Sequence, residues 1–163
     1  MELTSVDVAP TRPGILQKER PSSKAQAATG DGLYLQGYDL LLEPAAPILR
    51  LFWETGDGVE TDWTTYVHLH DDRGTRVAQY DGPALAGVQP TSQWHTNALY
   101  IDRRRLNLQP ELQPGNYLLR IGLYNLETGQ RLPFQPHDAA QEQFENGQLL
   151  IPFSVASPIR VPD

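Results

Sequence analysis

Hydrophobic and polar residues alternate along several short stretches of this chain, which is the pattern of strands that bury one face. The clearest stretch is 116–125, where alternate positions predict one inward face: Tyr117, Leu119, Ile121 and Leu123. Residues 48–54 repeat the pattern, with Leu49, Leu51 and Trp53 on one face. Arg50 and Glu54 then lie on the other face.

Turn-forming residues separate these stretches. The sequence DDRG at 71–74 predicts a hairpin turn with glycine at a positive φ, and LETG at 126–129 predicts another turn. Gly37 predicts a bulge inside the first strand. We expect one short helix at 137–147, capped by Asp138 and ended by Gly147. The expected strands are 33–42, 48–54, 63–70, 76–81, 94–101, 116–125, 130–134 and 148–156.

Eight strands at this spacing predict an all-β fold with little helix. Two antiparallel sheets would pack as a β-sandwich, of the jelly-roll or immunoglobulin-like kind. The 163 residues suffice for one domain with a single core. We expect the sandwich over 32–157 and a C-terminal tail over 158–163. Residues 1–31 contain prolines and small residues without a sustained period, and so predict an extended arm or linker.

Composition narrows the classes of partner. The net charge of −7 repels a phosphate backbone, and the basic run 103–105 has no interleaved aromatic residues, so we expect no nucleic-acid partner. The chain has no cysteine, which excludes disulfides and thiolate metal sites. No run of about 18 apolar residues predicts a membrane span. The N-terminus also lacks the residue order of a signal peptide.

Six short phrases occupy roughly the central half of the chain. They are LFW at 51–53, DWTTYVHL at 62–69, VAQYDGP at 77–83, PTSQW at 90–94, PGNYLLRIGLY at 114–124 and TGQRLP at 128–133. Together, in this order and spacing, they resemble the β-sandwich accessory domain of large bacterial multi-pass membrane proteins that are glycosyltransferase-like and depend on lipid carriers.

The resemblance implies a non-catalytic sandwich on the extracytoplasmic face of the membrane, tethered to a membrane enzyme. The catalytic residues of such an enzyme would lie in its transmembrane part, so the resemblance transfers no active-site residue to this chain. After the Pro-Thr-Ser-x-Trp phrase, the family commonly has Gly-Glu and an acidic partner, whereas this sequence has His95-Thr96-Asn97-Ala98. The resemblance therefore implies no function for that loop.

Two groups of residues are candidate metal ligands. His68 and His70 are two apart on one expected strand and project from the same face, as in a cupin jelly roll. A cupin also needs a Glu and a third His, so a packed or surface histidine pair is the competing interpretation. Asp57, Glu60 and Asp62 offer oxygen ligands to a structural calcium ion, and a solvated acidic turn competes with that interpretation. We expect no other cofactor.

Trp94 is the candidate glycan platform, because it directly follows the polar loop 89–93. Gln93, Gln79 and Asp81 are the hydrogen-bonding groups expected beside it. An aromatic ring next to amides and a carboxylate suits the apolar face and the hydroxyls of a sugar. The competing interpretation is that Trp94 fills one end of the core.

The leading functional hypothesis is a non-catalytic accessory module that binds glycan or docks on its parent membrane protein. One alternative is a small metal-dependent jelly-roll enzyme that uses His68 and His70. Another is a purely structural spacer. We find no Ser-His-Asp motif and no phosphate-binding glycine loop in the sequence.

Overall fold

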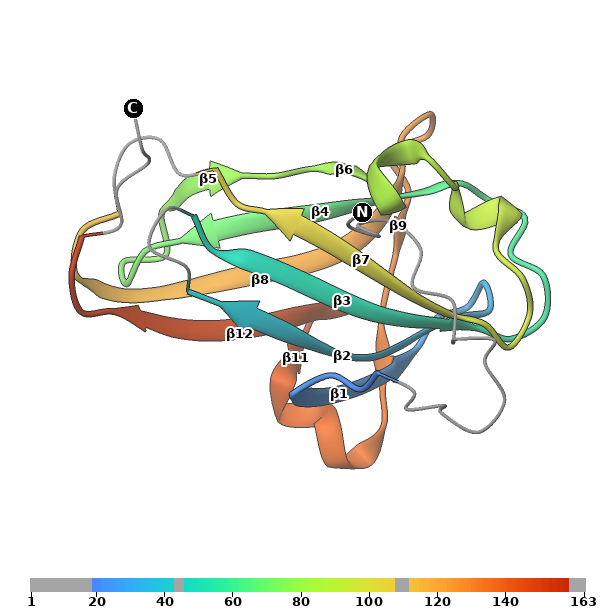
Figure 1. Cartoon of the computed structure of the whole chain (residues 1–163), viewed down its shortest axis with the longest axis horizontal. Helices are drawn as coiled ribbons and strands as arrows, with labels where there is room; N and C mark the ends of the chain where they lie inside the picture. The colour runs from blue at the N-terminus through green and yellow to red at the C-terminus, as the bar shows by residue number, and fades with distance from the viewer. Residues whose placement is uncertain (1–18, 43–45, 108–111, 159–163) are drawn as a thin grey trace.

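The computed structural model describes residues 19–42, 46–107 and 112–158, which form two packed antiparallel sheets (Figure 1). In order across the first sheet, the strands are β10 (Gln135–Pro136), β1 (Ser23–Ala28), β2 (Leu33–Leu41), β3 (Ile48–Thr55) and β7 (Leu99–Arg105). The second sheet has the order β11 (Phe144–Glu145), β12 (Gln148–Val155), β8 (Gly115–Asn125), β4 (Trp63–His70) and β5 (Arg76–Gln79). In addition, β6 (Gly82–Pro83) pairs with β4, and β9 (Arg131–Leu132) pairs with β8.

The expected all-β sandwich with little helix is therefore confirmed. Eight of the described strands have four or more residues, and four further strands have two residues each. The described helices are three short 3₁₀ segments: η1 (Ala84–Gly87), η2 (Thr91–Gln93) and η3 (Asp138–Gln143).

Two of the expected elements are placed differently. The strand expected at 94–101 begins only at Leu99 and continues to Arg105, because η2 and a left-handed residue, Asn97 at φ 62°, interrupt the extended chain before it. The helix expected at 137–147 is a 3₁₀ segment followed by β11. Its N-cap is His137 without a side-chain cap bond, so the predicted cap by Asp138 is wrong.

The expectation of an extended arm over 1–31 is wrong for part of that range. Residues 23–28 form β1, which pairs with β2 and turns Ala25 and Ala27 into the core, with exposed fractions of 0% and 1%. Alanine has low strand propensity, so an Ala/polar alternation gave little strand signal. Residues 1–18 lie outside the described part, as do residues 159–163 of the expected tail.

The core lies between the two sheets. Leu119, Ile121 and Leu123 of β8 are at most 2% exposed, and Tyr117 packs against them only partly buried, so the predicted inward face is confirmed. From the first sheet, Leu49, Leu51 and Trp53 project into the same core, again as predicted. Trp53 stacks on Phe134 with ring centroids 5.9 Å apart.

The predicted bulge and hairpin are both present. The register of β2 against β3 shifts between Leu35 and Gly37, where a Cβ on Gly37 would lie 2.2 Å from the carbonyl oxygen of Ser23. Only glycine permits this close approach of two backbones. In the turn 71–74, Gly74 has φ 78° and donates to the carbonyl of Asp71.

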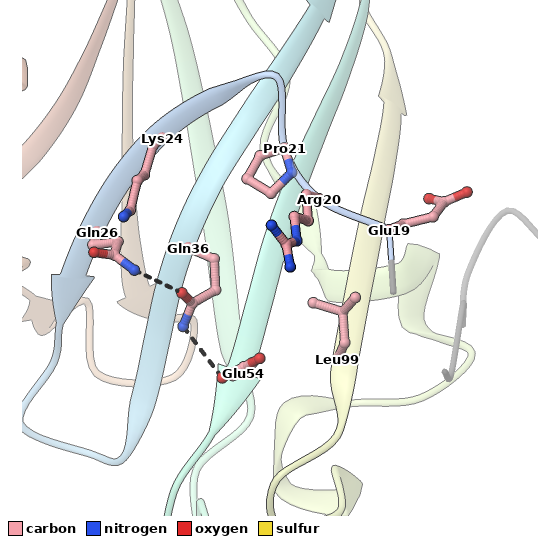
Figure 2. Close-up of a pocket in the computed structure, with 8 residues that line it drawn as sticks. All are labelled: Glu19, Arg20, Pro21, Lys24, Gln26, Gln36, Glu54 and Leu99. Carbon is pink, nitrogen blue, oxygen red and sulfur yellow. Dashed lines mark hydrogen bonds between the residues drawn. The ribbon is translucent and has the colours of Figure 1, made fainter. Parts of the chain in front are cut away.

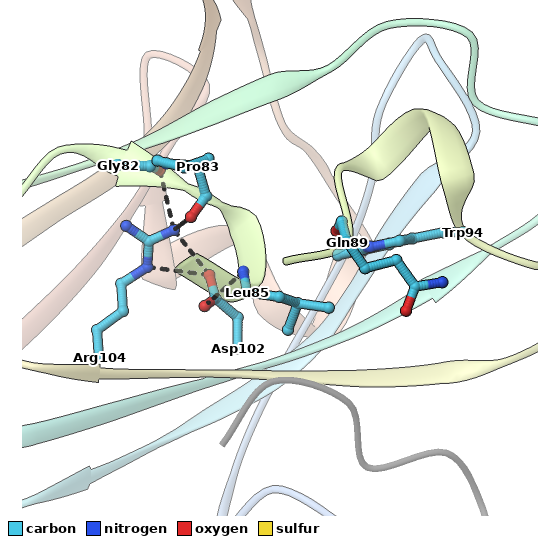
Figure 3. Close-up of polar contacts among 7 residues, drawn as sticks. All are labelled: Gly82, Pro83, Leu85, Gln89, Trp94, Asp102 and Arg104. Carbon is cyan, nitrogen blue, oxygen red and sulfur yellow. Dashed lines mark hydrogen bonds and ion pairs between the residues drawn. The ribbon is translucent and has the colours of Figure 1, made fainter. Parts of the chain in front are cut away.

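Asp102 and Arg104 connect the edge of the first sheet to the edge of the second (Figure 3). The carboxylate of Asp102 is 1% exposed and accepts hydrogen bonds from Nε and Nη2 of Arg104, at 2.9 and 2.8 Å, and from the N–H of Leu85 at 3.1 Å. Arg104 also donates to the carbonyls of Gly82 and Pro83, at 3.1 and 3.2 Å. This ion pair closes one open side of the sandwich.

We expect Ile121→Asp to lower the free energy of unfolding by about 3 kcal/mol or more, because it buries an unpaired charge in the core. Urea denaturation measures the change. The matched control is Leu118→Asp, at a partly exposed position on the outer side of the same strand, where a loss of about 1 kcal/mol or less is expected. Equal losses in the two variants would contradict the inward face of β8.

Candidate functional site

Trp94 is not an exposed platform. Its side chain is 6% exposed and stacks on Tyr100 with ring centroids 4.4 Å apart. Its Nε1 donates to the carbonyl of Gln89 at 2.9 Å (Figure 3). Of the two interpretations of Trp94, the structure therefore favours the core one. Gln93 is exposed at the end of η2.

Gln79 and Asp81 lie on a different surface, the outer face of the second sheet. Gln79 is paired in register with His68 of β4. One carboxylate oxygen of Asp81 lies 3.4 Å from Nε2 of His68, and the other accepts a hydrogen bond from the hydroxyl of Tyr124 at 3.4 Å. The structure therefore brings Gln79 and Asp81 together with His68, and it leaves Trp94 in the core.

Aromatic rings surround this contact. We call Tyr66, His68, Asp81, Tyr124 and Arg131 the Tyr66 cluster. The ring of Tyr66 lies 5.0 Å from that of His68 and 6.2 Å from that of Tyr124, and the guanidinium carbon of Arg131 lies 5.0 Å from its centroid. The cluster is thus a continuous layer of stacked and hydrogen-bonded groups.

A glycine on the neighbouring strand allows this arrangement. Tyr66 is paired in register with Gly122 of β8, and a Cβ at Gly122 would lie 2.1 Å from the Tyr66 hydroxyl oxygen. Any larger residue would displace the ring. Tyr66 is consequently buried, at 4% exposed, whereas Tyr124 remains partly exposed beside it.

Burial sets the protonation of these groups. It lowers the pKa of His68 below its ordinary value, and the nearby Asp81 carboxylate acts in the opposite direction. The pKa of His70 is lowered, first by burial and then by Arg120 and Arg76. The pKa values of Tyr66 and Tyr124 are raised, in both cases chiefly by burial. At neutral pH the surface therefore presents neutral imidazoles and phenols beside charged groups.

Such a surface can bind hydroxylated molecules. Tyr124 offers a partly exposed ring for an apolar sugar face, Asp81 offers acceptor oxygens, and Arg131 offers donors. His68 adds a neutral group that both donates and accepts.

The candidate metal ligands do not assemble. Among the described residues, no group of three or more His, Asp or Glu side chains is placed to hold a metal ion. The rings of His68 and His70 lie edge to face, 6.5 Å apart, and the cupin set has no third member there. Asp62 instead accepts a hydrogen bond from the N–H of Ser92, so the predicted calcium site of Asp57, Glu60 and Asp62 is not formed.

Several hollows open on the described surface, and the positions of three of them bear on the site. A cleft of about 520 Å³ lies at one end of the sandwich, between the loops that contain Glu60, Pro90 and Glu127. It borders the Tyr66 cluster through Thr64, which is paired with Tyr124. A groove of about 370 Å³ crosses the outer face of the first sheet (Figure 2). A recess of about 270 Å³ lies beside the Asp102–Arg104 pair.

The glycan-binding residues predicted from the sequence did not include three members of this site: Tyr66, Tyr124 and Arg131. A signal existed for Tyr66, which alternates with His68 and His70 and so shares their outward face. Tyr124 and Arg131 approach it only through the pairing of β8 with β4 and β9, which the sequence did not reveal.

The fold and this surface define an all-β, two-sheet sandwich with a polar aromatic cluster on one outer face. The chain matches no protein-family model and no curated protein. Within 19–42, 46–107 and 112–158, no helix is long and apolar enough to cross a membrane.

We expect Trp94→Ala to cost about 3–5 kcal/mol of unfolding free energy, because it removes a buried indole and its stacking on Tyr100. Urea denaturation tests this. The control is Gln93→Ala at the exposed neighbouring position, for which a change within about 0.5 kcal/mol is expected. A small loss for Trp94→Ala would show that the indole is not part of the core.

We expect Asp81→Asn to lower the His68 pKa further, since the Asp81 carboxylate is the neighbour that favours the imidazolium. NMR titration of the His68 ring protons measures the shift. In the wild type the pKa of His68 is lower in the folded protein than in the unfolded chain, so the unfolded chain binds more protons. The free energy of unfolding therefore falls as the pH falls through the range below about 6.5. Asn in place of Asp81 should leave the His70 titration largely unchanged. An unshifted His68 pKa in the variant would contradict the contact.

Proposed function

We propose that this protein is a non-catalytic β-sandwich accessory module that binds glycan through the Tyr66 cluster. The observation that carries the proposal is the partly exposed ring of Tyr124 beside the Asp81 carboxylate, on a rigid sheet face. Sugars are bound by such a combination, since a ring covers their C–H face while carboxylates and guanidinium groups bind their hydroxyls.

The surroundings support an extended ligand. The loop-end cleft of about 520 Å³ continues from the cluster and contains both hydroxyl and amide groups, from Thr61, Thr64 and Asn125. Its volume falls in the range of small-molecule sites. A chain of sugar units could therefore lie across Tyr124 and end in the cleft.

The resemblance described from the sequence favours the same surface. Four of its six phrases fall on the strands that build or border the cluster: β4, β5 with β6, β8 and β9. On this basis we propose that the module belongs to the extracytoplasmic part of a glycosyltransferase-like membrane protein, where glycans of the cell envelope would be its ligands.

We expect Tyr124→Ala to weaken glycan binding about fivefold to thirtyfold, because stacking of a ring on an aromatic side chain contributes about 1–2 kcal/mol. The wild type is first screened on a glycan array, and the best ligand is then titrated by calorimetry. Tyr124→Phe keeps the ring and loses only the bond to Asp81, so it should retain most of the affinity.

Tyr34→Ala is the matched control, because it removes another exposed tyrosine from the opposite sheet. It should leave binding unchanged. A silent array would contradict the proposal and favour docking on the parent protein or a spacer role. A stoichiometric transition metal in the purified protein would instead favour the enzyme that uses His68 and His70.

A further inference from the structure

The groove on the outer face of the first sheet is far from the Tyr66 cluster in the fold, since it lies on the other sheet. Its lining comes from β1, β2, β3, β7 and the segment just before β1 (Figure 2). The lining residues are Glu19, Arg20, Pro21, Lys24, Gln26, Gln36, Glu54 and Leu99.

A chain of hydrogen bonds fixes the amides of this groove. Nε2 of Gln26 donates to Oε1 of Gln36 at 3.2 Å, and Nε2 of Gln36 donates to Oε2 of Glu54 at 3.3 Å. The three residues belong to three neighbouring strands, so the chain runs across the sheet. Each amide is held in one orientation and keeps further hydrogen-bonding capacity for a ligand.

The central amide, that of Gln36, lies at the bulge in β2. The register of β2 against β3 shifts between Leu35 and Gly37, and Gln36 is the extra residue of this bulge. Alternation along the strand places Gln36 on the outer face, because the preceding Leu35 is fully buried in the core. Because only glycine fits at position 37, the position of Gln36 is a built feature of the strand.

The charges of the groove are unequally compensated. Glu19 is paired with Arg50, and Glu54 accepts the bond from Gln36. Among the described residues, neither Arg20 nor Lys24 has an ion-pair partner. Two cations thus lie beside fixed amides in a protein whose net charge is −7.

We infer that this groove binds a small acidic saccharide, with its carboxylate between Arg20 and Lys24 and its hydroxyls on Gln26 and Gln36. Arginine binds a carboxylate through two parallel N–H bonds, and lysine adds a mobile positive charge. The amides offer the donors and acceptors that sugar hydroxyls need. The volume of about 370 Å³ is at the lower end for ligand sites, which suits one or two sugar rings.

Calorimetric titration of the full chain tests this inference with three probes: a uronic acid disaccharide, the corresponding neutral disaccharide and inorganic phosphate. We expect the uronic acid disaccharide to bind at least tenfold more tightly than either of the others. Equal binding of the neutral disaccharide would show that the cations do not act on the ligand. Equal binding of phosphate would show a general anion site without saccharide recognition. Either result overturns the inference, as does absence of binding.

Variants locate the site. Arg20→Gln, Lys24→Gln and Gln36→Ala should each weaken binding of the uronic acid disaccharide about fivefold or more. Arg73→Gln is the matched control, since it removes an equal charge from the exposed hairpin turn 71–74 and should leave binding unchanged. Unchanged melting temperatures for Arg20→Gln and Lys24→Gln confirm that they are folded. Full affinity in these two variants would overturn the inference. Tyr124→Ala reports only on the other sheet, so the two surfaces succeed or fail separately.

Discussion

The buried pair of Asp102 and Arg104 is the interaction on which the arrangement of the two sheets depends at their open side. β7 is the edge of the first sheet as described, and an inward charge on an edge strand discourages pairing with another chain. Here the charge is compensated, because the guanidinium reaches the carbonyls of Gly82 and Pro83 beside the second sheet. The same carboxylate holds the N–H of Leu85, a buried residue at φ 53°. A left-handed conformation costs a non-glycine residue about 1 kcal/mol or more, which this bond and the burial of Leu85 offset.

Closing the sandwich in this way leaves both outer faces open, and each has a different chemistry. The second sheet presents stacked rings around the contact of His68 with Asp81. The first presents an amide chain centred on Gln36, beside two cations, Arg20 and Lys24, that have no ion-pair partner within the described part of the chain. Glycines permit close approaches at both faces: Gly122 makes room for the ring of Tyr66, and Gly37, next to Gln36, lets the backbone of Ser23 approach β2. Backbone geometry therefore determines which polar groups the two faces offer to a ligand.

Trp94 illustrates how the core competes with the surface for aromatic residues. A tryptophan after a polar loop is typical of a binding platform. In this structure, however, the indole N–H donates to the carbonyl of Gln89, and the ring stacks on Tyr100. Burying the indole gains apolar area without leaving its donor unpaired. Its neighbour Gln93 in the polar loop stays exposed to water.

The sequence by itself determined the elements that depend on neighbours along the chain. These elements are the strands predicted from alternation in 116–125 and 48–54, the glycine turn at 71–74 and the bulge at Gly37. Each depends only on residues close in the sequence, and each was predicted correctly. Strand β1 was missed because alanines carry little strand preference on their own, and they are buried only once β2 lies beside them. The Tyr66 cluster and the groove were decided by tertiary structure alone. Their members come from strands far apart in the sequence, and a contact such as that of Asp81 with Tyr124, 43 residues apart, exists only after the sheets have formed.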